Sequence, residues 1–135
     1  MTVKGAKLEH VGVAVKSIAE ARRLYEEALG LTFGGEEVLA EQGLKLVFFD
    51  AGGVKIELLE GLGDDPISKF IEKRGPGIHH LCFEVDDVEE AAASLKADGY
   101  EFVTEAPYEG GHGTRVIFMR PQSTFGVLVE LLEKI

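Results

Sequence analysis

The chain is poor in cysteine and contains no long apolar run. Cys82 is the only cysteine in the 135 residues, which excludes an intrachain disulfide and suits a reducing compartment. No apolar run approaches the ~20 residues needed to cross a membrane. The N-terminus also lacks the apolar core of a signal peptide. From these absences we expect a cytoplasmic protein that does not contact a membrane.

Basic residues are also scarce relative to acidic ones. The sequence has 14 Lys and Arg against 24 Asp and Glu, a formal net charge of −10. This balance argues against nucleic acid as a partner, and an anionic ligand would need a local basic patch. A chain of this length can bury roughly two-thirds of its unfolded surface, so the fold itself requires neither a metal nor a disulfide. We expect a single domain over residues 1–135.

What the chain does contain is one pattern written twice. Residues 8–17 and 78–87 each hold a short apolar strand, with His10 in one copy and His80, 70 positions later, in the other. The last strands of the copies, 54–60 and 127–133, again match. Looking for such repeats first is justified, because a repeat defines the architecture. Here it divides the chain into two similar modules.

Both copies also have the signal that begins a helix. Ser17 is followed three residues later by Glu20, and Asp87 is followed three residues later by Glu90. Each pair reads as a capping box, in which the first side chain accepts from a backbone N–H of the first turn. Gly30 is positioned to end the first helix. At helical spacing, the residues expected to face the core are Ala21, Leu24, Tyr25, Ala28 and Leu29.

The pattern predicts an α+β fold: two βαβββ modules forming a curved eight-stranded mixed sheet around a metal site. Module one covers about 7–60, a linker covers 61–77, and module two covers about 78–133. Within the linker, Asp65 followed by Pro66 favours the start of a short helix ending near Lys73. The second module's helix should run from Val88 to about Ala97.

Four polar residues repeat on strands that are otherwise apolar. Each of them lies opposite a row of apolar side chains, so packing of those rows under the helices would place all four on the other face. They are His10, Glu57, His80 and Glu130. Taken singly, a strand histidine can be a structural hydrogen-bonding residue, and a strand glutamate can be solvent-exposed. Brought together, two carboxylates repel unless a cation balances them. Two imidazoles and two carboxylates suit one divalent ion per chain, such as Co, Mn, Ni, Fe or Zn.

At this point the chain resembles the vicinal oxygen chelate (glyoxalase-like) superfamily and, within it, the methylmalonyl-CoA epimerases. The likeness covers about residues 7–133. It rests on the stretches 8–15, 65–71, 77–87, 111–113, 121–123 and 127–131. Two positions depart from the family pattern: Arg120 replaces a common His, and Phe125 replaces a common Gly.

The resemblance implies an acyl-CoA substrate and epimerisation at C2 through a metal-stabilised enolate. We also expect a homodimer, and the repeat allows the two modules to pair either within a chain or across the dimer. The resemblance implies that His10, Glu57, His80 and Glu130 bind the metal and that Glu41, in the turn before the third strand, is catalytic. Glu130 is the candidate for the second acid/base. We expect weaker substrate contacts from Lys55, His112, Arg115 and Ser123.

Three other functions compete with the epimerase. A lactoylglutathione lyase-type isomerase would use similar ligands and similar enolate chemistry. A dioxygenase normally uses two histidines and one carboxylate, so the fourth ligand argues against it. A drug-sequestering protein of the same fold needs no metal, and the complete His/Glu set disfavours it.

Overall fold

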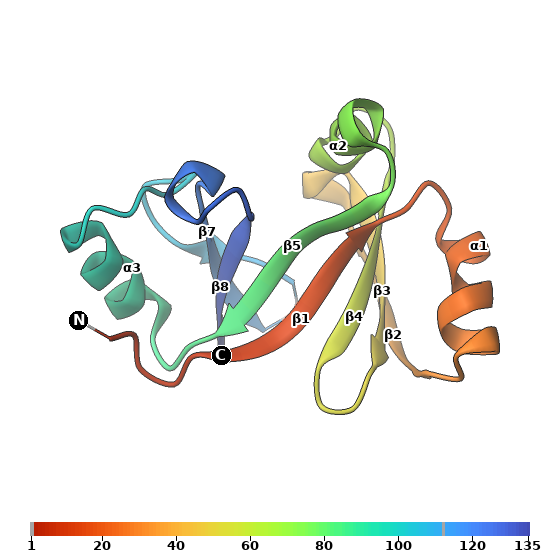
Figure 1. Cartoon of the computed structure of the whole chain (residues 1–135), viewed down its shortest axis with the longest axis horizontal. Coiled ribbons are helices and arrows are strands. Elements are labelled where there is room, and N and C mark those ends of the chain that lie inside the picture. Colours follow the sequence, from red (N-terminus) through yellow and green to blue (C-terminus); the bar gives the residue numbers. More distant parts are fainter. Residues whose placement is uncertain (1, 112) are drawn as a thin grey trace. The chain divides into compact units, whose positions relative to one another are not determined.

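The structure, a computed structural model, describes residues 2–111 and 113–135 and divides into two compact units (Figure 1). The first unit is His10–His79. The second unit joins the N-terminal segment, up to Glu9, to His80–Ile135. Contacts of the N-terminal segment account for this grouping: Val3 packs against the second unit's core, and Asp86 donates its backbone N–H to the Lys4 carbonyl at 3.3 Å.

The first unit contains four strands in the order β2-β3-β4-β1. Its elements are β1 (Lys7–Ala14, from His10 onward), α1 (Ile18–Arg22), the π-helix η1 (Arg23–Ala28), β2 (Thr32–Leu39), the 3₁₀ turn η2 (Ala40–Gln42), β3 (Leu44–Asp50), β4 (Lys55–Gly61) and α2 (Pro66–Arg74). The pair β1–β4 is parallel, and the other pairs are antiparallel. A register shift between Phe33 and Gly35 marks the bulge that the glycine pair at 34–35 predicts.

The second unit repeats the same order as β5-β8-β7-β6. Its elements are β5 (Gly77–Glu84, from His80 onward), α3 (Val88–Ala97), β6 (Tyr108–Glu109), β7 (Thr114–Met119), the 3₁₀ turn η3 (Pro121–Ser123) and β8 (Val129–Lys134). The pair β5–β8 is parallel, and β8–β7 and β7–β6 are antiparallel. The α+β class and the two βαβββ modules are therefore confirmed.

Helix starts follow the capping signals. Ser17 Oγ accepts from the Glu20 N–H at 3.1 Å, and Asp87 Oδ1 accepts from the Glu90 N–H at 3.0 Å. Asp65 caps α2 in the same way through the Ser68 N–H at 2.8 Å. The helix predicted from Val88 to Ala97 is confirmed at both ends.

The first helix differs from the prediction in its second half. After Arg22 the chain winds as a π-helix, in which the Leu29 N–H donates to the Leu24 carbonyl, five residues earlier, at 2.8 Å. The wider winding shifts the phase of the later side chains. Leu24 is 50% exposed and Leu29 is 59% exposed, whereas Ala21 and Tyr25 still pack on the core. The expectation that Leu24, Ala28 and Leu29 face the core is wrong for this reason.

Each unit packs an apolar sheet face under its first helix. In the first unit, Ile18 of α1 joins a core that also contains Val47, Phe49 and Leu58. In the second unit, Val88, Ala91 and Ala92 of α3 pack on Ile117 and Leu131. The other face of the first unit's sheet has its own apolar cluster, which includes Ile67 of α2. Among the described residues, no helix is both long and apolar enough to span a membrane.

Candidate active site

The first unit brings one predicted histidine next to one predicted glutamate. In the parallel β1–β4 pair, His10 lies opposite Lys55 and Gly12 lies opposite Glu57. Their apolar neighbours Val13 and Ile56 face the α1 core, so His10 and Glu57 face the other way. The His10 Nε2 atom is 3.6 Å from Glu57 Oε1, and the imidazole is buried, with the residue 3% exposed.

The second unit builds the same pair from β5 and β8. His80 Nε2 lies 3.0 Å from Glu130 Oε1, and the two residues are 4% and 7% exposed. The Phe118 ring meets the His80 ring edge-on, with centroids 5.6 Å apart. This aromatic contact and the burial fix the orientation of the imidazole.

Both pairs have the geometry of ligands to a divalent ion. Two ligand atoms about 2.1 Å from one ion, at adjacent octahedral positions, lie about 3.0 Å apart, and widening the angle to about 120° separates them by about 3.6 Å. The measured separations are 3.0 Å in the second unit and 3.6 Å in the first. Imidazole nitrogen and carboxylate oxygen are also the donor set that such ions prefer. The donor types and separations of each pair are therefore consistent with the predicted ligand set for one divalent ion per chain.

Strand register identifies which other side chains share the face of His80 and Glu130. Glu130 lies opposite Cys82 on β5 and Phe118 on β7, while Leu132 lies opposite Val116. Contacts among Cys82, Val116 and Leu132 confirm that these rows share a face. Tyr108 of β6 lies opposite Val116 and therefore belongs to the same face. We call this the His80 face.

Tyr108 is the residue of the His80 face that the sequence did not single out. It is 37% exposed, and burial, together with the negative charge of Glu130, raises the pKa of its phenol. The phenol therefore stays protonated at neutral pH and can donate a hydrogen bond. Its strand has only two residues and follows an irregular loop, so no period-2 pattern could have shown which way the side chain points.

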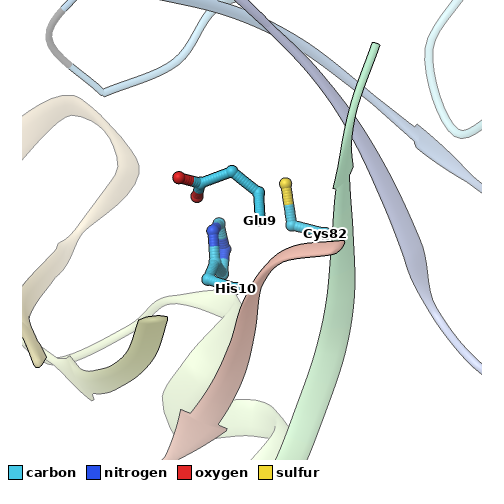
Figure 2. Close-up of side chains that lie close together, drawn as sticks. All are labelled: Glu9, His10 and Cys82. Carbon is cyan, nitrogen blue, oxygen red and sulfur yellow. The ribbon is translucent and has the colours of Figure 1, made fainter. Parts of the chain in front are cut away.

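A second group of candidate ligand atoms lies beside the start of β1. Figure 2 shows Glu9 and Cys82 of the second unit, whose ligand atoms lie within 4.8 Å, together with the next residue along β1, His10. Glu9 is already balanced, because the Lys134 ammonium lies 3.3 Å from Glu9 Oε2. Burial lowers the pKa of Lys134, but Glu9 and Glu84 outweigh that effect and raise it. The Cys82 thiol is buried and packed with apolar side chains.

Glu41 lies on the exposed turn η2. Leu44 pairs with Gly61, and Phe48 pairs with Glu57. Four residues of extended strand, about 13 Å, therefore separate the row of Glu57 from the start of β3, which follows this turn.

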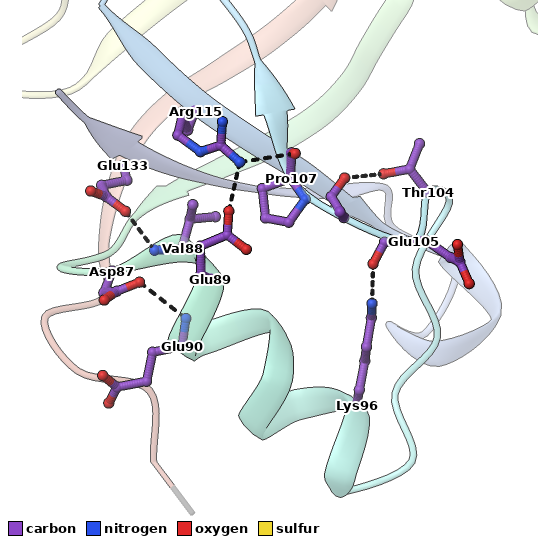
Figure 3. A network of polar contacts seen from close by, with 11 residues as sticks. Asp87, Val88, Glu89, Glu90, Lys96, Thr104, Glu105, Pro107, Arg115 and Glu133 are labelled. Atoms are coloured by element: carbon purple, nitrogen blue, oxygen red, sulfur yellow. Dashed lines mark hydrogen bonds and ion pairs between the residues drawn. The ribbon is translucent and has the colours of Figure 1, made fainter.

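The remaining predicted contact residues fall in different places. Lys55 extends over the Phe48 ring, with its Nζ 5.1 Å from the centroid. Arg115 alternates with Val116 and so belongs to the α3 side, where it pairs with Glu89 at 2.6 Å and donates to the Pro107 carbonyl at 3.1 Å (Figure 3). Ser123 Oγ accepts from the Glu101 N–H at 2.9 Å. His112 lies outside the described residues.

Comparison with known proteins identifies the family of this chain. A profile of the Glyoxalase/Bleomycin resistance protein/Dioxygenase superfamily matches residues 9–118. The mitochondrial methylmalonyl-CoA epimerase of Bos taurus is 42% identical over 127 residues, which cover 93% of this chain and 73% of that protein. The crystal structure of methylmalonyl-CoA epimerase from Mycobacterium tuberculosis superposes with a TM-score of 0.92 at 31% identity, covering 100% of this chain and 93% of that one. This chain belongs to the methylmalonyl-CoA epimerase family.

A solved structure with a bound ligand adds chemical context to the family assignment. A methylmalonyl-CoA epimerase in complex with methylmalonyl-CoA and NH4+ has a TM-score of 0.89 and 28% identity, and the match covers 98% of this chain and 96% of that one. Members of the methylmalonyl-CoA epimerase family are isomerases, so this chain is an enzyme of that class. The resemblance seen in the sequence is confirmed.

Proposed function

We propose that the protein epimerises methylmalonyl-CoA at C2 and that His10, Glu57, His80 and Glu130 bind the one divalent ion that this reaction needs. The observation that supports the ion most directly is the His–Glu pair in each unit, at 3.6 Å and 3.0 Å. Relatives named as methylmalonyl-CoA epimerases support the substrate. When bound, the ion supplies positive charge beside the acyl oxygens and so favours loss of the C2 proton.

The chain's own residues then have to move that proton. The C2 proton lies between a thioester and a carboxylate, and its removal sends charge to the thioester oxygen. Epimerisation needs acid/base groups on both faces of C2, because the proton leaves from one face and returns to the other. We propose Glu130 for one face and Glu41 for the other. Glu41 acts only if the turn at 40–43 lies over the bound substrate.

The burial of the His–Glu pairs has a chemical consequence. Charged groups interact more strongly where water is excluded, so carboxylates and imidazoles that are mostly buried act strongly on bound substrate charge. Glu57 and Glu130 have side chains 16% and 10% exposed. Two such carboxylates need a balancing cation, which links the ion to the electrostatics of the site.

Exchange at C2 tests the proposal. The protein is incubated with methylmalonyl-CoA in deuterated water, and C2 is followed by NMR before and after removal and return of a divalent metal. We expect both epimers to form and deuterium to enter C2, and we expect chelation to abolish both. If no deuterium enters C2 with Co, Mn, Ni, Fe or Zn, the proposed function is overturned. A hemithioacetal of glutathione, offered in parallel, separates a lactoylglutathione lyase from an epimerase.

Variants of the two acid/base candidates test their roles. Glu41→Gln and Glu130→Gln each keep the side-chain shape but remove the base. Because Glu130 is also a proposed metal ligand, exchange by Glu130→Gln is compared with the wild type at equal metal content. Positioned acid/base groups typically contribute about 10²–10⁴-fold, so we expect exchange into one epimer to fall by at least roughly 10²-fold for each. Glu36→Gln, a change at an exposed position of β2, is the matched control and should exchange at the normal rate. Normal exchange by metal-loaded Glu41→Gln would show that the base lies elsewhere.

A further inference from the structure

We infer that Tyr108 is a further catalytic residue, whose phenol donates a hydrogen bond to the acyl-thioester oxygen as negative charge develops there. This inference rests on the proposed function. It gives a chemical role to a side chain of the His80 face that is neither a ligand candidate nor part of a core cluster.

The placement of Tyr108 follows from two strand pairings. Tyr108 lies opposite Val116 on β7, and Val116 lies opposite Leu132 on β8. Glu130 is two residues before Leu132, so it occupies the next row of the same face. Two strand spacings of about 4.8 Å separate β6 from β8. The tyrosine and glutamate side chains project from the same face, so both phenol and carboxylate can reach a ligand bound over that face.

A close backbone packing contact holds β6 in place. A Cβ added to Gly110 would lie only 2.8 Å from the Val116 Cγ1 atom, so only glycine fits there without a shift. The Gly110 N–H donates to the Thr114 carbonyl at 3.1 Å, and Thr114 Oγ1 donates to the Gly111 carbonyl at 2.7 Å. The loop after Tyr108 is thus tied directly to β7. This support positions the backbone of β6 before any substrate arrives.

The electrostatics of the His80 face call for a donor of this kind. The register places Tyr108 and Glu130 in adjacent rows of this face. The proposed ion balances the charge of Glu130, and a neutral phenol adds a hydrogen-bond donor for the acyl oxygen without adding a charge. The α3 side of the strands has Arg115, but that guanidinium is already bound to Glu89 and to the Pro107 carbonyl. The partial exposure of Tyr108, at 37%, leaves its edge accessible to a ligand.

The phenol is expected to act mainly in the transition state. A hydrogen bond to an oxygen strengthens as charge accumulates on it, so a donor to the thioester oxygen stabilises the enolate-like state more than the bound substrate. Loss of the hydroxyl should therefore lower kcat more than it raises KM. A contact with the substrate carboxylate, whose charge is constant, would instead change KM.

The experiment compares Tyr108→Phe with Tyr100→Phe, using metal-loaded protein and methylmalonyl-CoA. Tyr100 is 40% exposed in the segment after α3 and receives the same loss of one hydroxyl. We expect kcat of Tyr108→Phe to fall roughly 10- to 100-fold, the range for a hydrogen bond to a charged group. KM and metal content should stay within about twofold of the wild type. The thermal unfolding midpoint should stay within about two degrees, because substitutions at exposed positions usually change stability little. Tyr100→Phe should behave as the wild type.

Three results would overturn the inference. They are an unchanged kcat in Tyr108→Phe, a loss confined to KM, and a loss of metal content that accounts for the fall in activity. If the wild-type protein shows no C2 exchange, the proposed function fails first and independently. If Tyr108→Phe unfolds, Tyr108→Trp is used instead. It keeps an aromatic ring, but its N–H donor lies at a different distance from the backbone. Full activity of Tyr108→Trp would contradict a role that needs the phenol oxygen.

Discussion

At the scale of single residues, Phe125 is the position where sequence and backbone disagree most. It is 99% exposed and has φ 60°, and Gly126 after it has φ 87°. The Val127 N–H donates to the Thr124 carbonyl at 3.3 Å. Two successive positive φ values inside such a bond are characteristic of a type I′ turn, which favours Asn-Gly. A phenylalanine gains nothing here from burial and carries the strain of the left-handed region.

This conflict gives a stability prediction. The left-handed conformation costs an L-residue about 1–2 kcal/mol, and asparagine tolerates it better than other side chains. We expect Phe125→Asn to raise the free energy of unfolding by about 0.5–1 kcal/mol, measured by urea titration. Phe125→Ala removes the ring but keeps the strained Cβ, so it should change stability little. A destabilised Phe125→Asn would mean that the ring makes a contact that stabilises the protein in solution.

The sequence was informative about residues on regular strands and uninformative about those in irregular segments. His10, Glu57, His80 and Glu130 could be paired within each unit because period-2 alternation and the repeat both apply to them. Tyr108 and Phe125 follow loops, where the direction of a side chain depends on dihedral angles that no periodicity reports.

At the scale of elements, two side chains in each unit accept hydrogen bonds from backbone N–H groups at the start of the helix. One is the local cap, and the other comes from the last strand. Glu60 of β4 accepts from the Ile18 N–H at 2.7 Å, and Glu133 of β8 accepts from the Val88 N–H at 2.9 Å (Figure 3). The local caps Ser17 and Asp87 serve the third helical residue. These glutamates lie 73 positions apart, like Glu57 and Glu130, so the repeat includes a structural pair beside the chemical one.

The strand-to-helix bond predicts a measurable stabilisation. Val88 is fully buried, so its N–H would be left without a partner if the Glu133 carboxylate were removed. A hydrogen bond to a charged group contributes about 1.5–3 kcal/mol. We expect Glu133→Ala to lose about that much unfolding free energy while retaining metal binding. Glu72→Ala, at an exposed position of α2, is the control and should fall within about 0.5 kcal/mol of the wild type. Equal stability of the two variants would rule out a capping role.

Element boundaries could be predicted where caps and periodicity agree. The helix α3 has Asp87 before it and Gly99 soon after it, and its predicted limits are confirmed. The helix α1 has an equally clear start, but it continues as a π-helix in which Tyr25 stacks on Phe49, with ring centroids 6.4 Å apart. A tertiary contact of this kind is invisible to a pattern based on 3.6 residues per turn.

At the scale of the whole molecule, the repeat predicts what each unit contains, but not which segments pack together. The second unit includes the chain start through Val3 in its core and through the Lys134–Glu9 ion pair at 3.3 Å. The ion pair joins residues 134 − 9 = 125 positions apart, and neither contact is part of the repeated pattern. The ligand set needs donors from both units, so its assembly stays a prediction of the repeat and of the family resemblance.

Metal binding is where that prediction can be measured on the entire chain. A ligand at a hundredfold excess over its Kd stabilises the folded state by about 2.7 kcal/mol. For a chain of this size, that corresponds to about 10 °C in Tm. We expect chelated wild-type protein to bind one divalent ion per chain and to gain a shift of this order when the ion is returned. His80→Ala removes one ligand and should reduce the shift to near zero.

The neighbouring histidine supplies a control that differs by one position. His79 faces away from the His80 face, with its ring 4.9 Å from the Phe70 ring, so His79→Ala changes packing but no proposed ligand. It should start from a lower Tm and still gain the full metal-induced shift, with one ion bound per chain. Equal metal-induced shifts in His80→Ala and the wild type would remove His80 from the ligand set. Loss of the shift in both variants would mean that the packing of β5, and not the imidazole of His80, limits metal binding.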